Sequence, residues 1–181
     1  MRTAKGTISV FTFKDGILAR AAHDLALRME QFDVTLDGDH ITAVMPLEGL
    51  AVLGPVEGGV VRAERCDAAQ RADVERTMHA EVLHSASSPE ARYAGRAIAD
   101  GAGFHVDGQL ELAGRTATLA FDVRRDGDVY RARFEIPPSR WGIAPYKALL
   151  GAIKLKDSVR IELALTESAP SAPSPSAPSN G

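Results

Sequence analysis

The sequence predicts a mainly β fold, a single closed antiparallel β-barrel of about eight strands with one amphipathic α-helix. Three observations lead to it. Apolar and polar residues alternate along most of residues 1–167, turn-forming residues separate the alternating stretches, and one stretch alone has a clear helical repeat. Alternation of this kind is typical of antiparallel sheets that bury one face and expose the other.

The clearest strands lie between residues 104 and 136. In residues 104–112 the apolar residues fall on one face, Ala113-Gly114 forms a turn, and residues 116–123 alternate again. A third strand covers residues 130–136 and ends at Pro137-Pro138. The other predicted strands are 7–13, 25–29, 32–36, 41–47, 92–98 and 159–165. Between Met29 and Phe32 the apolar positions change from odd to even, which predicts a bulge or bend at Glu30-Gln31.

The helix is expected between Asp67 and Leu83. Val74, Met78 and Val82 recur every fourth residue, and Asp67 with Gln70 resembles a capping box. A second helical turn or loop is expected at residues 146–153, whose apolar residues fit the same repeat. The last segment, 168–181, reads SAPSAPSPSAPSNG and is predicted to be a disordered tail. This tail is either a docking segment or a tolerated extension of the 1–167 domain.

Composition excludes several classes of protein. The 181 residues include 21 basic and 24 acidic ones, a balance of −3 that argues against a nucleic-acid partner. One cysteine rules out an internal disulfide and a cysteine-rich zinc module. No apolar run is long enough for a membrane-spanning helix or for the core of a signal peptide. We therefore expect a cytoplasmic protein, and the sequence leaves its oligomeric state open, a homodimer included.

Few residues suggest catalytic chemistry. His23 beside Asp24 is either a general base, a polar contact for a ligand, or a structural histidine. His79 and His84 are five residues apart, which is not the spacing of a helical zinc site. Cys66 follows Arg62 and Arg65 but belongs to no nucleophile motif. The sequence therefore predicts no catalytic residue, no metal site and no cofactor.

The apolar faces of the strands carry the strongest functional signal. Most of the aromatic residues of the chain lie in the predicted strands or close to them. If these faces enclose a lumen, it suits a long apolar ligand. If the side chains fill it, the barrel is simply a packed core.

Four stretches resemble one known family. Residues 18–25 (LARAAHDL) are similar to its Gly-His-Asp-Leu element, with Ala22 in place of glycine. Residues 71–83, continuing to Pro89, resemble its helix and the following strand, although Ala91 and Tyr93 stand where Ile and Phe are usual. Residues 106–114 are similar to its Val-x-Gly-x-Leu-Thr-x-x-Gly hairpin, and residues 140–156 resemble its Asp-Phe-Gly-Ile segment.

By these motifs the chain resembles the YceI-like family of polyisoprenoid-binding, lipocalin-like barrels over about residues 5–166. The resemblance implies a non-enzymatic binding or carrier protein whose lumen holds an isoprenoid-type lipid, such as a polyprenyl quinone or polyprenyl phosphate. Many members of that family are periplasmic. Two alternatives are a packed barrel that serves as a protein-interaction module and, less favoured, an enzyme that uses His23 on a small substrate.

The expected ligand-binding residues come from three places. They belong to the apolar strand faces, to the histidine element and to a mouth formed by residues 141–150. The full set is Phe11, Phe13, His23, Leu25, Phe104, Phe121, Phe134, Trp141, Ile143, Tyr146, Leu149 and Leu150.

Overall fold

The fold was analysed in a computed structural model, which describes residues 1–15, 24–148 and 153–168. Its strands are β1 (Arg2–Asp15), β2 (Asp24–Met29), β3 (Asp33–Asp37), β4 (His40–Pro46), β5 (Leu50–Glu57), β6 (Val60–Val61), β7 (Glu90–Asp100), β8 (Gly103–Leu112), β9 (Arg115–Asp126), β10 (Val129–Ile136), β11 (Lys147–Ala148) and β12 (Ile153–Ser168). The helix α1 (Ala68–Thr77) continues into a π-helical turn, Met78–Val82. Short 3-10 turns cover Leu47–Gly49, Ala63–Arg65 and Pro138–Trp141.

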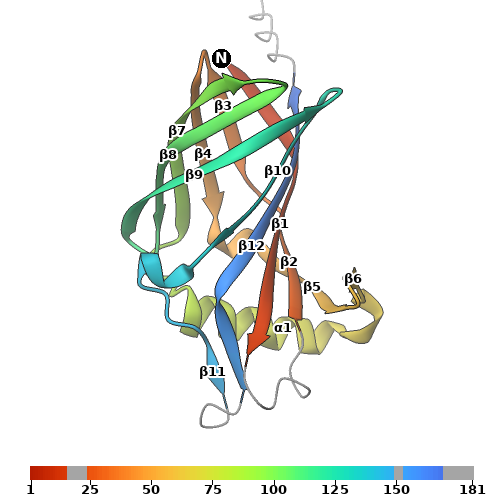
Figure 1. The fold of residues 1–181 in the computed structure, drawn as a ribbon. Helices are drawn as coiled ribbons and strands as arrows, with labels where there is room; N and C mark the ends of the chain where they lie inside the picture. The colour runs from red at the N-terminus through yellow and green to blue at the C-terminus, as the bar shows by residue number, and fades with distance from the viewer. Residues whose placement is uncertain (16–23, 149–152, 169–181) are drawn as a thin grey trace, which may run out of the picture.

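Eight strands close an antiparallel barrel. Around the barrel they follow the order β12, β10, β9, β8, β7, β4, β3 and β1, and β1 pairs again with β12. The long strands β1 and β12 continue below this ring, where β1 pairs with β2, and β2 with β5 (Figure 1). The predicted fold class, a lipocalin-like barrel with one helix, is confirmed.

Strand β1 changes partner along its length. Its first residues pair with β3, up to Ala4, and from Ile8 onward it pairs with β2 on the same edge. Residues 30–32 connect β2 to β3, so the bend expected at Glu30-Gln31 is a break between two strands. This break explains why the apolar parity changes there. The break also keeps the apolar side chains of both β2 and β3 on the side of the sheet that faces the barrel interior.

The helix lies across the lower end of the barrel (Figure 1). Asp67 caps it by accepting a hydrogen bond from the Gln70 amide, and the Gln70 side chain accepts one from the Asp67 amide, which completes the predicted capping box. The backbone amide of Val52 in β5 donates to Glu75 Oε1 at 2.7 Å, tying the helix to the sheet. Val74 and Met78 pack against the apolar residues of β2 and β5.

Two boundaries differ from the sequence predictions. The helical turn or loop expected at 146–153 is wrong in its described part, because Lys147 and Ala148 form β11 and pair with Lys154 and Ile153. The apolar spacing there fits a helix, but pairing with β12 satisfies the backbone of these residues instead. Strand β12 runs through Ser168, and the rest of the predicted tail lies outside the described residues. Within the described ranges, no helix is both long and apolar enough to cross a membrane.

Candidate ligand-binding site

The registers of the strands fix which side chains face the barrel interior. Tyr93 in β7 is opposite Leu110 in β8, which is opposite Ala117 in β9, and all three lie on the interior face. Counting by twos along β9 and β10 places Phe121 and Phe134 on this face as well, and on β12 it places Ile161 there. These inward positions are therefore apolar, as the alternation predicted.

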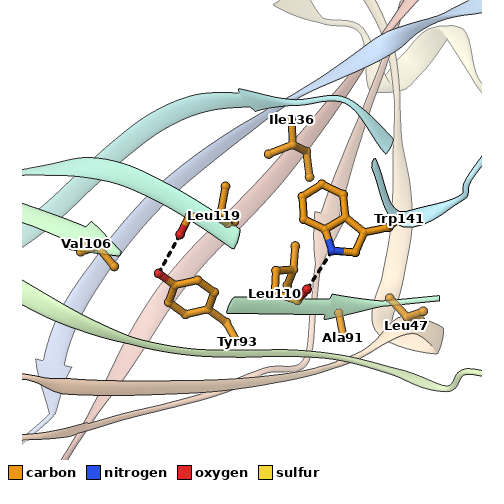
Figure 2. Packing of buried hydrophobic residues seen from close by; sticks show 8 residues of the cluster. All are labelled: Leu47, Ala91, Tyr93, Val106, Leu110, Leu119, Ile136 and Trp141. Carbon is orange, nitrogen blue, oxygen red and sulfur yellow. Dashed lines mark hydrogen bonds between the residues drawn. The ribbon is translucent and has the colours of Figure 1, made fainter. Parts of the chain in front are cut away.

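One half of the wall is tightly packed. Its buried cluster consists of Leu47, Ala91, Tyr93, Val106, Leu110, Leu119, Ile136 and Trp141 (Figure 2). Val106 is 1% exposed and Trp141 is completely buried. The Trp141 indole nitrogen donates to the Leu110 carbonyl at 2.8 Å, and the Tyr93 hydroxyl donates to the Leu119 carbonyl at 3.2 Å. The two polar groups of these rings are thus satisfied by the backbone.

Tyr93 lies across a pair of glycines. Gly95 and Gly108 are opposite each other on β7 and β8, and a Cβ at either position would lie 2.8 Å from the Tyr93 hydroxyl oxygen. Because neither glycine has a side chain, the phenol ring can lie close to the backbone of β7 and β8. Burial, with a contribution from Asp107, raises the pKa of Tyr93 to about 12. The phenol therefore stays protonated and keeps its hydrogen bond at neutral pH.

The second half of the wall has its own cluster. Ile8, Leu27, Met29, Leu50 and Val52 are buried together, with Val74 and Met78 of the helical segment packed over them. Met45, Leu83 and Ile161 are half-buried and contact both clusters. The apolar interior therefore contains two buried clusters, which these three half-buried residues join.

A group of aromatic rings packs against the first cluster. Phe121 and Phe134 stack with their centroids 4.3 Å apart, Tyr93 lies 5.9 Å from Phe121, and Phe104 lies 6.0 Å from Tyr130. Phe104, Phe121 and Phe134 face inward and yet are only half-buried. Inward apolar side chains that remain partly accessible are what an apolar binding lumen requires.

A pocket of about 350 Å³ lies at the end of the barrel next to Trp141. Four short segments line it: residues 81–84 at the end of the helical segment, residues 87–88, the β8–β9 turn with Arg115, and residues 141–144. The sequence analysis identified Trp141 and Ile143 in this region. It missed Arg115, whose side chain also lines the pocket, because a lone arginine after a turn has no distinguishing pattern.

The structure places the remaining predicted residues in three groups. Leu25 in β2 is opposite Thr12 in β1, and both lie on the interior face. Trp141 and Ile143 are buried, whereas Tyr146 is half-buried and its carbonyl accepts from the Leu155 amide. His23, Leu149 and Leu150 lie outside the described residues.

The prediction that Phe11 and Phe13 face the lumen is wrong. Interior positions on β1 are even-numbered, as Ile8 and Val10 show, and Phe11 is opposite Arg160 in β12. The Arg160 guanidinium lies 4.5 Å from the Phe11 ring centroid and 5.3 Å from that of Phe13. These two phenylalanines form a cation–π cluster on the opposite face.

The other polar candidates do not gather into a metal centre. No group of three metal-binding side chains occurs in residues 1–15, 24–148 and 153–168. His105 is on the outer face, where it shares a hydrogen bond of 2.8 Å with Asp122, and this bond raises the pKa of the histidine. His84 is exposed at the rim of the pocket and has a positive φ of 48°.

Comparison with solved structures gives the same architecture. The crystal structure of BcnA from Burkholderia cenocepacia superposes with a TM-score of 0.61 at 13% identity, covering 90% of this chain and 96% of BcnA. A polyisoprenoid-binding domain from Saccharophagus degradans, described as implicated in plant cell wall breakdown, gives 0.60 at 11% identity, with coverage of 93% and 98%. The YCEI protein of Campylobacter jejuni gives 0.53 at 11% identity, with coverage of 77% and 81%.

At these identities the structures establish the shared fold and no more. No curated protein matches the chain in sequence. The family description of the YceI-like domain does match it, over residues 3–166. This match spans the barrel from β1 to β12, and the chain therefore belongs to the YceI-like family.

Proposed function

We propose that this protein is a non-enzymatic binding or carrier protein for an amphiphilic isoprenoid-type lipid, a polyprenyl quinone or a polyprenyl phosphate, held in the barrel. The observation that carries the proposal is the set of inward aromatic and aliphatic side chains that stay half-buried while they pack against the buried clusters of the barrel. Family membership and the polyisoprenoid-binding domain of similar fold support it.

The driving force would be burial of the hydrocarbon chain. Each square ångström of apolar surface removed from water contributes about 25 cal/mol. Phe104, Phe121 and Phe134 offer flat, rigid surfaces for this contact. An isoprenoid chain, with a methyl branch on every unit, has the shape and polarity to fill such a space.

Native mass spectrometry of the full chain tests the proposal. We expect a stoichiometric mass increase, either as purified or after incubation with a polyprenyl quinone and a polyprenyl phosphate. Replacing Phe121 with glutamate should abolish the increase, since a carboxylate would have to be buried against hydrocarbon. The matched control is Phe13→Glu, which places the same charge beside Arg160 on the opposite face and should leave uptake unchanged.

A second variant separates loss of binding from loss of folding. Ala97→Phe adds an uncharged ring to a half-buried interior position on β7 and should reduce uptake while circular dichroism stays native. An unliganded mass under every condition would contradict the carrier proposal and favour the packed barrel as a protein-interaction module. Retained uptake in both Phe121→Glu and Ala97→Phe would show that the lipid binds outside the lumen.

A further inference from the structure

The pocket beside Trp141 joins an apolar interior wall to a charged rim. Its inner lining includes Trp141 and Leu83, and Leu83 also contacts both apolar clusters of the barrel. Its outer lining includes the side chains of Arg115, His84 and Glu81, all exposed. A molecule placed here would have its polar end among charges and its apolar end directed past Leu83 toward the interior.

Arg115 brings an uncompensated charge to this rim. Several exposed arginines of the barrel, such as Arg96 and Arg133, are within 4.0 Å of a carboxylate, whereas Arg124, at the other end of β9, has no carboxylate that close among the described residues. In the part of the chain that the structure describes, Arg115 has no such ion pair and no side-chain hydrogen bond. A guanidinium without a partner is suited to a planar, two-point contact with a carboxylate or a phosphate.

Gly142 makes room for this guanidinium. A Cβ at position 142 would lie 2.7 Å from Cζ and Nε of Arg115, so any side chain there would displace the arginine. Gly142 also has a φ of 77°, a left-handed conformation that favours glycine. The Arg115 side chain thus packs against the main chain next to Trp141, which holds its charge at the pocket.

One acidic group at the rim of the pocket, the Glu81 carboxylate, would repel a bound anion. The Glu81 carboxylate lines the same pocket and is exposed to solvent. The Glu81 carboxylate forms no ion pair with Arg115. Its oxygens therefore lie more than 4.0 Å from the Arg115 nitrogens. In water, the repulsion from such an exposed carboxylate is weak beside direct hydrogen bonds to a guanidinium.

We infer that this pocket binds the anionic phosphate head group of the carried amphiphile through Arg115. The inference rests on the proposed function and selects the prenyl phosphate over the neutral quinone. The guanidinium donates two hydrogen bonds to phosphate oxygens, and the hydrocarbon chain enters the barrel past Leu83.

A chain-matched pair of ligands tests the inference on the full-length protein. Trp141 is the single tryptophan and lines the pocket, so its fluorescence reports occupancy directly. A polyprenyl monophosphate should bind at least about tenfold more tightly than the polyprenyl alcohol of the same length, since hydrogen bonds to charged groups are the stronger ones. Arg115→Gln should remove this preference and leave the affinity for the alcohol unchanged.

Two further variants sharpen the test. Arg124→Gln removes an exposed arginine from the other end of β9 and should keep the preference. Glu81→Gln should strengthen phosphate binding about twofold, because it removes a weak repulsion at the rim. The preference should also weaken at high salt, as screening requires.

The outcomes separate the two proposals. If phosphate and alcohol bind equally, or if Arg115→Gln keeps the preference, the head-group site is wrong while lipid carriage stands. If neither lipid binds, both proposals fail. If inorganic phosphate alone binds with the same dependence on Arg115 and the lipid gains nothing over it, the pocket is a free-anion site and the lipid head-group assignment is overturned.

Discussion

The two edges of strand β9 are held in different ways. On one edge, β9 pairs with β8 over ten residue pairs, from Gly103–Arg124 to Leu112–Arg115. On the other edge, it pairs with β10 over three, from Val129–Asp126 to Arg131–Arg124. Beyond those three pairs the strands diverge from the turn that joins them (Figure 1). The barrel is therefore closed by a full ladder on one side of β9 and by a short one on the other.

Side chains replace the missing ladder. The Arg140 guanidinium donates to the Thr118 carbonyl, on the edge of β9 that faces β10, at 3.2 Å. Inside the barrel, Phe121 of β9 stacks on Phe134 of β10. Ladder bonds open cooperatively, whereas side-chain contacts are lost one at a time. The barrel is therefore more rigid where β9 pairs with β8 than where it pairs with β10.

The largest effect is expected from disturbing the other edge of β8, where it pairs with β7. In Gly108→Ala, the added methyl would lie 2.3 Å from the Ala94 carbonyl oxygen and 2.6 Å from the Gly95 Cα. Because both are backbone atoms, the β7–β8 ladder must shift, at a cost of about 2–3 kcal/mol in the free energy of unfolding. Urea denaturation measures this loss.

The control substitution lies on the outer face of the same wall. Ala120→Val enlarges an exposed side chain on β9 and should change stability by less than about 0.5 kcal/mol. An equal loss of unfolding free energy in both variants would show that Gly108 is packed no more closely than the exposed face of β9.

Amide hydrogen exchange sharpens the comparison residue by residue. Strand β8 has a partner on each side, so its amides should be protected without interruption. In residues 132–136 of β10, which pair with β12 but not with β9, every second amide has no ladder partner. Those amides should exchange about 100-fold faster than their neighbours. Uniform protection along β10, measured by NMR, would contradict the open edge.

Much of the fold was predictable because it follows from local pattern. The alternation at residues 104–136, the turn at Ala113-Gly114 and the capping box at Asp67 all express rules that act over a few residues. The predictions failed where a distant partner decided the outcome. Residues 147–148 form a strand because β12 lies beside them, and Phe11 faces outward because its partners fix the register of β1.

The site was less predictable than the fold. Phe104, Phe121 and Phe134 follow from alternation, since a consistent face on consecutive strands must converge inside a barrel. Arg115 and Tyr93 do not follow from any local pattern. Their significance comes from Gly142 beside one and the Gly95–Gly108 pair beside the other, contacts between segments far apart in the sequence.

The smallest expected effect concerns the hydrogen bond between Tyr93 and β9. Tyr93→Phe keeps the ring in the packed cluster and removes the donor to the Leu119 carbonyl, at a cost of about 1 kcal/mol near neutral pH. The pKa of Tyr93 is about 12 in the folded protein and near 10 in the unfolded chain. Above pH 10 the unfolded chain therefore releases a proton that the folded protein still holds, and the stability due to this group falls as the pH rises toward 12.

The variant has no such proton, so the stability advantage of the natural sequence should shrink progressively between pH 10 and pH 12. Comparing the two proteins cancels the titration of Tyr130, whose pKa is also raised by burial and by its hydrogen bond to Glu167. Urea denaturation at several pH values measures the difference. A constant difference across this range would mean that the phenol is open to solvent and that the barrel interior does not shelter its hydrogen bond to the Leu119 carbonyl.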